Sequence, residues 1–419
     1  MPTLKELFAL FGKEAPEVPV RGLTLDSRRV EPGFVFVAVP GVPLPHRKPL
    51  DGHDFVPEAL ARGAVAVVGE RPLALPVPYL QVADGRQALA LLARRFHGEP
   101  DRKLLLVGVT GSKGKSTTAS LLHHLLKRAQ GGSALLSTVG LRLGEEARPP
   151  VGHFTTPEAP EVYAFLREAA DRGLKSAVLE VSSRALALKR VEGLTFRVGV
   201  FVNFYPDDHL DFHGSMEEYF AAKSMLFDPA RSRAAVINVD DERGSSLAAS
   251  VSIPVVRCSV SSLTDVRIGV EEVSYRWRGH RLVVNAGGSF AVLNSLLALE
   301  VAVALGCPVD DVARAAVSIR PVEGRLEVVP TGADYSVIVD YAHTPEALRA
   351  VLSSVRTLTT GRLVVVFGCG GGRDQGKRAE MGRAVHELAD IAFVTSDNPR
   401  FEDPESIINE ILTGMTGTG

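Results

Sequence analysis

A glycine-rich loop between a strand-like run and a helix-like run constrains the fold of this chain more than any other feature. Residues 104–107 (LLLV) predict a buried parallel strand, and residues 110–118 read TGSKGKSTT. The next stretch is amphipathic, with leucines at helical spacing at positions 121, 122, 125 and 126. A strand, a glycine loop and a helix in this order point backbone N–H groups and a helix N-terminus at a phosphate group. The segment therefore predicts an α/β fold with a nucleotide-phosphate site.

Residues of this loop have predicted roles in binding ATP. Gly111 and Gly114 belong to the predicted site. Lys115 would neutralise the terminal phosphates, and Ser116 or Thr117 would meet a magnesium ion. Position 109 is a valine where the strict Walker motif has a glycine. The structural alternative is a glycine turn with a solvated lysine, which the strand-loop-helix context disfavours.

The rest of the chain predicts three α/β domains, over residues 1–98, 99–324 and 325–419. Short strand-like runs and a helical stretch at residues 84–96 precede a polar break at residues 97–101. The second domain has apolar runs separated by segments of helical length, the pattern of a doubly wound parallel sheet. The third domain has a further set, which predicts a Rossmann-like arrangement. These strand candidates are residues 177–179, 198–201 and 234–237 in the second domain and 336–339, 363–366 and 391–394 in the third.

Composition excludes several classes of partner. Lys and Arg number 47 against 49 Asp and Glu, so no strong basic field favours nucleic acid or an anionic membrane. Three widely spaced cysteines without a CxxC pair favour a reducing, cytoplasmic setting. No apolar run approaches the roughly 20 residues of a membrane span, and the first residues do not resemble an export signal. We expect a monomeric cytoplasmic protein.

Polar side chains after two of the predicted strands suggest a metal site. Glu180 closes the run at residues 177–179, and His209 lies in a loop after another strand. Open α/β sheets bind ligands beyond the carboxyl ends of their strands, so both side chains could reach a magnesium ion at the phosphate loop. The alternatives are a helix-capping acid and a loop histidine with ordinary hydrogen bonds.

Lys223 lies on an apolar helical stripe with Met216, Tyr219, Phe220 and Phe227. Its amine either reaches water along the surface or is desolvated. A neutral amine can react with carbon dioxide to form a carbamate, which could bind magnesium. Spacing alone favours the amine that reaches water.

Together these segments resemble the Mur ligase family, over the chain from about Arg21 to its end. The resemblance depends on the phosphate loop and on several short motifs spread along the chain. These motifs are residues 26–28 (DSR), 51–53 (DGH), 155–158 (TTPE), 180–183 (EVSS), 208–211 (DHLD) and 340–345 (DYAHTP), with Lys223.

The resemblance implies a role for each matching position. Ser27 would hold the uridine diphosphate end of a substrate, and Lys115 and Thr117 would bind ATP phosphates. Glu180 and His209 would bind magnesium, with a carbamylated Lys223 supporting a second ion. The muramoyl-dipeptide contacts would be Thr155, Thr156, Ser182 and Arg190. The further nucleotide contacts would be Asn294, Arg325, Asp340 and His343, with Asn238 and Asp240 as additional candidates.

The implied activity is an ATP-dependent ligation in peptidoglycan precursor synthesis. The D-glutamyl carboxylate of UDP-N-acetylmuramoyl-L-alanyl-D-glutamate would take the γ-phosphate of ATP, and an amine would then attack the acyl phosphate. Asp397, Asn398 and Arg400 match the motif that reads the incoming amino acid. Arg400 favours meso-diaminopimelate, since a guanidinium can clasp its second carboxylate. L-lysine or another diamino acid stays open, as does an arginine in a surface ion pair.

The chain departs from the family pattern at Ser112, Lys113, Arg184, Ala291 and Gly372. It also ends before a Gly-His-Glu motif of the family, so we expect a shortened third domain. Two alternatives stay open: a ligase similar to folylpolyglutamate synthetase, and a nucleotide-binding module without turnover.

Overall fold

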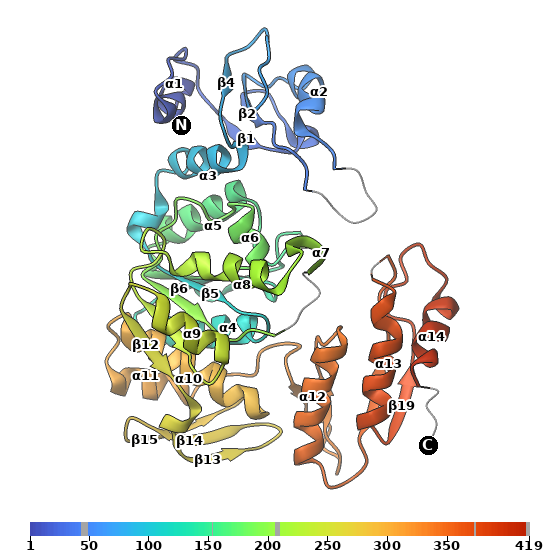
Figure 1. Ribbon diagram of the computed structural model, residues 1–419. Coiled ribbons are helices and arrows are strands. Elements are labelled where there is room, and N and C mark those ends of the chain that lie inside the picture. Colours follow the sequence, from blue (N-terminus) through green and yellow to red (C-terminus); the bar gives the residue numbers. More distant parts are fainter. Residues whose placement is uncertain (43–48, 153, 206–209, 373, 416–419) are drawn as a thin grey trace. The chain divides into compact units, whose positions relative to one another are not determined.

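The computed structural model describes residues 1–42, 49–152, 154–205, 210–372 and 374–415 (Figure 1). The chain forms two compact units, and we describe each one by itself. Unit 1 comprises Met1–Ser259 and Asn294–Ala315, and unit 2 comprises Val260–Leu293 and Ala316–Gly419. The domain limits expected from the sequence stay a prediction. In the described ranges no helix is long and apolar enough to cross a membrane.

Unit 1 begins with a four-stranded parallel sheet in the order β1-β2-β3-β4. Val35 and Val37 contribute to one hydrophobic cluster and Phe36 to another, because successive side chains of a strand point to opposite faces. The strands are β1 (Gly22–Thr24), β2 (Phe34–Val37), β3 (Ala66–Gly69) and β4 (Tyr79–Gln81). The helices are α1 (Leu4–Phe8), α2 (Val56–Ala61) and α3 (Gly85–Phe96), with 3-10 turns η1 (Ala9–Phe11), η2 (Ser27–Arg29) and η3 (Gly52–Phe55).

The second sheet of unit 1 has eight strands in the order β12-β11-β10-β5-β9-β6-β7-β8. The first six are parallel, and β7 and β8 extend the sheet as antiparallel strands. The predicted doubly wound sheet is confirmed. Its strands are β5 (Leu105–Thr110), β6 (Ser133–Ser137), β7 (Gly140–Leu143), β8 (Glu146–Arg148), β9 (Ser176–Glu180), β10 (Val198–Phe201), β11 (Ala235–Asn238) and β12 (Val255–Cys258).

Helices connect these strands, as parallel pairing requires. The helix after the phosphate loop, α4 (Lys115–Ala129), buries all four leucines of its predicted apolar stripe. The other helices are α5 (Ala159–Asp171), α6 (Ser183–Ala187), α7 (Leu210–His213), α8 (Met216–Ser224), α9 (Glu242–Ser250), α10 (Ser289–Ala304) and α11 (Val309–Ala316), with η4 (Pro100–Lys103) and η5 (Met225–Phe227).

Unit 2 contains three small sheets. β13 (Thr264–Ile268), β14 (Val273–Trp277) and β15 (His280–Val284) are antiparallel and follow η6 (Val260–Ser262). The three strands predicted for the third domain form, but they do not share one sheet among the described residues. β17 (Val337–Val339) pairs antiparallel with β16 (Glu327–Val329), and β18 (Val364–Phe367) pairs parallel with β19 (Ile391–Val394). The helices are α12 (Pro345–Leu358), α13 (Gly376–Leu388) and α14 (Pro404–Thr413).

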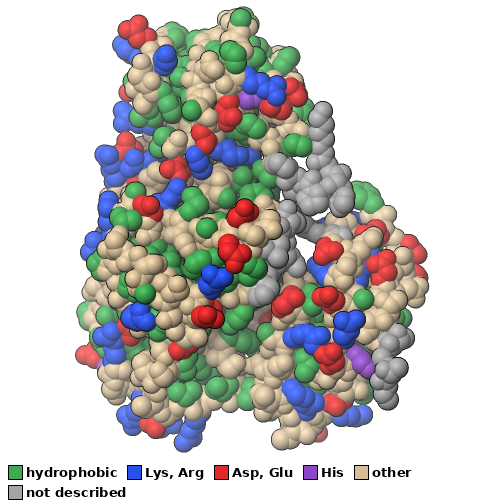
Figure 2. Space-filling model, in the orientation of Figure 1, with side chains coloured by type: hydrophobic (Ala, Val, Ile, Leu, Met, Phe, Trp, Pro, Cys, Tyr) green, Lys and Arg blue, Asp and Glu red, His purple; other side chains and the backbone are tan. Residues whose placement is uncertain are grey.

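Figure 2 shows acidic and basic side chains interspersed over the visible face, without a continuous basic field. This distribution agrees with the balanced charge of the sequence.

Candidate active site

The phosphate loop follows β5 and needs glycine at two positions. Gly111 and Gly114 have φ of +152° and +78°. A Cβ atom at Gly114 would lie 2.7 Å from Oδ1 of Asn294, so the loop and this asparagine are in close contact. Asn203, which follows β10, holds the phosphate loop in place. Its backbone oxygen accepts a hydrogen bond from Ser112 N at 3.0 Å, and its Oδ1 accepts one from Lys113 N at 2.9 Å.

Lys115, Ser116 and Thr117, all predicted to bind ATP, begin α4, and Asn294 covers the loop. Lys115 Nζ donates to the Gly111 and Ser112 carbonyl oxygens, both at 2.9 Å, and so spans the loop. Thr117 lies half-buried in the first turn. Asn294 is buried in α10, where its Oδ1 accepts from Thr118 Oγ1 at 3.3 Å. The structure therefore brings Asn294 to the phosphate loop across a long separation in sequence.

Glu180 ends β9, fully buried beside residues that the sequence analysis missed. Its Oε1 accepts from Ser137 Oγ, from Thr138 N at 3.1 Å and from Thr138 Oγ1 at 3.3 Å. The Thr138 hydroxyl also lies 2.8 Å from Ser116 Oγ. Thr138 thus joins the phosphate loop to Glu180. Ser137 is the last residue of β6. Since ligands bind beyond the ends of parallel strands, this position was the sequence signal that could have identified Ser137 and Thr138.

The residues present fit a magnesium ion. Glu180 Oε2 is buried and has no hydrogen-bond partner among the described residues. A buried carboxylate oxygen without a partner is costly unless a cation or donor approaches it. Carboxylate and hydroxyl oxygens suit Mg²⁺, which keeps several waters and needs few protein ligands. The described ranges contain no group of three or more His, Cys, Asp or Glu side chains that could hold a metal, and His209 lies outside them.

Lys223 is buried in α8, with 1% of its surface exposed. Its Nζ donates to the Gly111 carbonyl oxygen at 2.9 Å and lies 4.2 Å from the centre of the Tyr219 ring. The amine therefore points at the phosphate loop, and burial excludes the alternative in which it reaches water. Carbamylation stays a prediction.

Three predicted muramoyl-dipeptide residues share a hydrogen-bond network with Glu180. The Thr156 hydroxyl donates to the Glu180 backbone oxygen at 2.8 Å and accepts from Ser182 N at 3.2 Å. Arg190, 6% exposed, donates to the Thr156 backbone oxygen at 2.9 Å. Ser182 also caps α6, which orients the start of that helix. Thr155 is half-buried next to this network.

A second arginine approaches this network from helix α3. Arg190 pairs with Glu158 at 2.6 Å, and Arg86 of α3 lies 3.7 Å from the other oxygen of the same carboxylate. Burial lowers the pKa of Arg86, and the charge of Arg190 lowers it further, against the opposing effect of Glu158. Sequence reasoning missed Arg86 because nothing local distinguishes it from a solvated helix residue.

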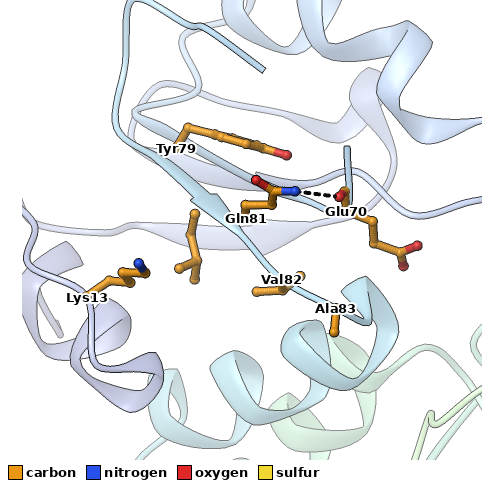
Figure 3. Close-up of a pocket in the computed structure, with 7 residues that line it drawn as sticks. Lys13, Glu70, Tyr79, Gln81, Val82 and Ala83 are labelled. Carbon is orange, nitrogen blue, oxygen red and sulfur yellow. Dashed lines mark hydrogen bonds between the residues drawn. The ribbon is translucent and has the colours of Figure 1, made fainter. Parts of the chain in front are cut away.

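Ser27 begins η2 and is buried near the N-terminal sheet. Its Oγ donates to Glu58 Oε2 of α2 at 2.8 Å, so its partner belongs to the N-terminal sheet region rather than to the network around Glu180. An open hollow of about 660 Å³ lies along β4, lined by Lys13, Glu70, Tyr79, Leu80, Gln81, Val82 and Ala83 (Figure 3). None of the predicted site residues lines it.

Unit 2 brings three further predicted nucleotide residues together beside β17. Asp340 accepts from Leu326 N and from Ala342 N, both at 2.8 Å. The Arg325 guanidinium lies 4.9 Å from the centre of the Tyr341 ring. His343 Nδ1 lies 2.9 Å from the Tyr341 backbone oxygen. Arg325 and His343 therefore contact the same tyrosine.

The predicted amino-acid residues Asp397, Asn398 and Arg400 are exposed in the loop after β19. Arg400 Nη1 donates to the Gly371 backbone oxygen at 2.6 Å. Among the described residues, Arg400 contacts this carbonyl oxygen. The alternative, an arginine in a surface ion pair, required a carboxylate as its partner.

Comparison with known proteins identifies the family. Three family models match: the Mur ligase family catalytic domain over residues 19–97, the Mur ligase middle domain over 109–302, and the Mur ligase glutamate ligase domain over 324–418.

Relatives match most of the chain. Two are named UDP-N-acetylmuramoyl-L-alanyl-D-glutamate--2,6-diaminopimelate ligase. The one from Geobacillus kaustophilus (strain HTA426) is 38% identical, over 94% of this chain and 82% of the relative. The one from Solibacter usitatus (strain Ellin6076) is 41% identical, over 97% and 83%. A solved structure with the same enzyme name has a TM-score of 0.73 at 29% identity and covers 97% of this chain and 85% of that one. The chain belongs to the Mur ligase family.

Proposed function

We propose that this chain is an ATP-dependent ligase that joins meso-diaminopimelate to UDP-N-acetylmuramoyl-L-alanyl-D-glutamate in peptidoglycan precursor synthesis. The observation that carries the proposal is one continuous network through the middle sheet. It runs from Ser116 through Thr138 to Glu180, and then through Thr156 to Ser182 and Arg190. Phosphoryl transfer needs the terminal phosphate and its acceptor side by side, and this network joins the residues expected to bind each of them.

The chain's own residues would mainly bind and orient the substrates. Lys115 and the N-terminus of α4 would offset the charge of the ATP phosphates. A carboxylate oxygen of the acceptor would form a bond to the γ-phosphorus as the bond to ADP breaks, which gives an acyl phosphate. The amine would then displace phosphate and lose a proton to form the amide. Ser116 and Glu180 would hold magnesium, which would offset charge on the transferring phosphoryl group when bound.

Arg400 supports the choice of amino acid. Its guanidinium is exposed in a loop with Asp397 and Asn398. Arginine binds carboxylates through two parallel hydrogen bonds, and meso-diaminopimelate carries a second carboxyl centre that L-lysine lacks. The names of the relatives support the same amino acid.

Mass spectrometry of one reaction tests the proposal. The mixture contains the uridine-linked muramoyl dipeptide, ATP, magnesium, and equal amounts of meso-diaminopimelate, L-lysine and L-ornithine. We expect a tripeptide product that contains meso-diaminopimelate. A product with lysine or ornithine would refute the assignment of the amino acid. ATP binding without any product would favour a nucleotide-binding module, and turnover with a folyl glutamate substrate in its place would favour the folate alternative.

The proposal also includes a monomer that acts in the cytoplasm and binds neither nucleic acid nor membrane. The balanced charge of the sequence supports the expectation that the protein binds neither nucleic acid nor an anionic membrane. Light scattering tests the oligomeric state, and the mass of a dimer would refute the proposed monomer.

A further inference from the structure

Two loops of unit 2 lie against each other beyond the ends of parallel strands β18 and β19. One is a glycine loop at residues 368–372, and the other is the loop at residues 395–402, which carries the predicted amino-acid residues. Thr395 N donates to the Phe367 backbone oxygen at 2.9 Å, and Gly371 N donates to the Asn398 backbone oxygen at 2.8 Å. The loops are therefore joined through their backbones.

The approach of the two loops leaves no room for a side chain at Gly368 or Gly371. A Cβ atom at Gly371 would lie 2.0 Å from the Pro399 backbone oxygen, and one at Gly368 would lie 2.3 Å from the Thr395 backbone oxygen. Such distances are below any real contact, so the backbones must shift if either glycine is replaced. The position of one loop thus determines the position of the other.

A buried arginine lies behind both loops. Arg378 of α13 has no exposed surface, and its Nη2 donates to both carboxylate oxygens of Glu402 at 3.0 and 2.9 Å. Its Nη1 donates to Glu410 of α14 at 2.9 Å. A buried guanidinium needs such partners, because an uncompensated charge is costly inside a protein.

Glu402 does more than compensate Arg378. Its Oε1 also accepts a hydrogen bond from the Gly372 backbone N–H. That bond, followed by the Arg378 hydrogen bond, lowers the pKa of Glu402. Glu402 therefore connects helix α13, the glycine loop and its own loop, whereas the hydrogen bond from Arg378 to Glu410 connects helix α13 to helix α14.

The backbone at Arg400 also needs support. Its φ is +52°, a left-handed conformation that is strained for residues other than glycine. The contact with the Gly371 carbonyl oxygen at 2.6 Å stabilises this conformation only while the glycine loop stays in place.

We propose that Arg378 and Glu402 are positioning residues for the amino-acid site. By holding Gly372 and the two loops, they set the geometry in which Asp397, Asn398 and Arg400 meet the incoming amino acid. The inference rests on the proposed function, since it concerns the amino-acid site of that ligase.

A matched pair of variants separates positioning from simple support of the fold. Glu402→Ala and Glu410→Ala each remove one carboxylate from Arg378, but only the first releases Gly372. We expect Glu402→Ala to raise the KM for meso-diaminopimelate by about tenfold or more, with the KM for ATP and for the muramoyl dipeptide within about twofold of wild type. Glu410→Ala should leave all three KM values within about twofold. Glu402→Gln, which keeps an acceptor for Gly372, should lie between the two.

Equal KM values for the amino acid in the two alanine variants would overturn the proposal, and so would an equal loss with all three substrates. Hydrogen exchange of the Gly371 and Gly372 amides gives a second measurement that does not depend on turnover. It should be faster in Glu402→Ala than in Glu410→Ala, with Glu402→Gln measured if the alanine variant does not fold. If the wild type forms no tripeptide, the proposed function is refuted. Equal exchange in the variants would refute the positioning role separately.

Discussion

Acid should destabilise the helix that carries the phosphate loop, and the cause is one buried histidine. His123 of α4 is 7% exposed, and its Nδ1 has no hydrogen-bond partner among the described residues. The pKa of His123 is lowered from 6.5 to about 3, chiefly by burial. The positive charges of Lys127, Arg142 and His124 contribute to this lowering, and the Glu145 carboxylate opposes it.

The sign follows from proton binding in the two states. Below pH 6.5 the unfolded chain protonates His123, whereas the folded chain keeps it neutral until about pH 3. The unfolded state binds more protons in this range, so the free energy of unfolding falls as the pH falls. Each pH unit costs about 1.4 kcal/mol, so acidification from pH 6.5 to 5 removes about 2 kcal/mol of stability through this side chain.

Urea denaturation of wild type and of His123→Leu at pH 7 and pH 5 measures this term. Leucine keeps the apolar volume of the helix face and cannot be protonated. Other groups that titrate contribute equally to both proteins, so the variant should lose about 2 kcal/mol less than wild type between the two pH values. His386→Leu is the control, because His386 is exposed on α13. This variant should lose as much stability between the two pH values as wild type does. Equal pH dependence in wild type and His123→Leu would refute the reasoning.

Three substitutions test other parts of the site. Thr156→Val leaves the Ser182 N–H and the Glu180 carbonyl without the Thr156 hydroxyl. It should lower the free energy of unfolding in urea by about 1–3 kcal/mol and raise the KM for the muramoyl dipeptide. Thr156→Ser keeps the hydroxyl and both hydrogen bonds. Glu180→Gln should lower kcat by about 100-fold or more and raise the magnesium concentration needed for half-maximal rate. An unchanged magnesium dependence would exclude Glu180 as a magnesium ligand. Chelation of magnesium should stop turnover by the wild type. Gly114→Ala should abolish measurable ATP binding in calorimetry, because its Cβ would lie 2.7 Å from Asn294 at a φ of +78°; normal binding would show that the loop does not need this close contact.

The phosphate loop and the parallel sheet were predictable because their signals are local. The strand, the glycines and the leucine stripe of α4 lie within one short stretch, and chain geometry fixes what they form. The strands predicted in the third domain also form, but the sequence did not predict that β17 would pair with β16 among the described residues. Strand partners depend on contacts between distant segments, and periodicity carries no information about them.

The missed residues have the same explanation. Thr138 reaches Glu180 only because β6 lies beside β9, and this order cannot be derived from either strand alone. A threonine after a strand is common, so its residue type gives no signal. The burial of Lys223 was equally hidden: spacing placed it on an apolar face, but only the packed structure shows its amine on the Gly111 carbonyl.

Glu158 illustrates how such contacts give meaning to a motif. The sequence assigned it no role of its own, yet two guanidiniums share its carboxylate: Arg190, in the turn after α6, at 2.6 Å, and Arg86 of α3 at 3.7 Å. Burial lowers the pKa of Arg86 and repulsion by Arg190 lowers it further, whereas the carboxylates of Glu158, Asp84 and Glu70 oppose the shift. An anionic substrate group nearby would offset the repulsion and so bind more favourably than a neutral one. Helix α3 therefore contributes charge, through Arg86, to the region where the proposed carboxylate substrate would bind.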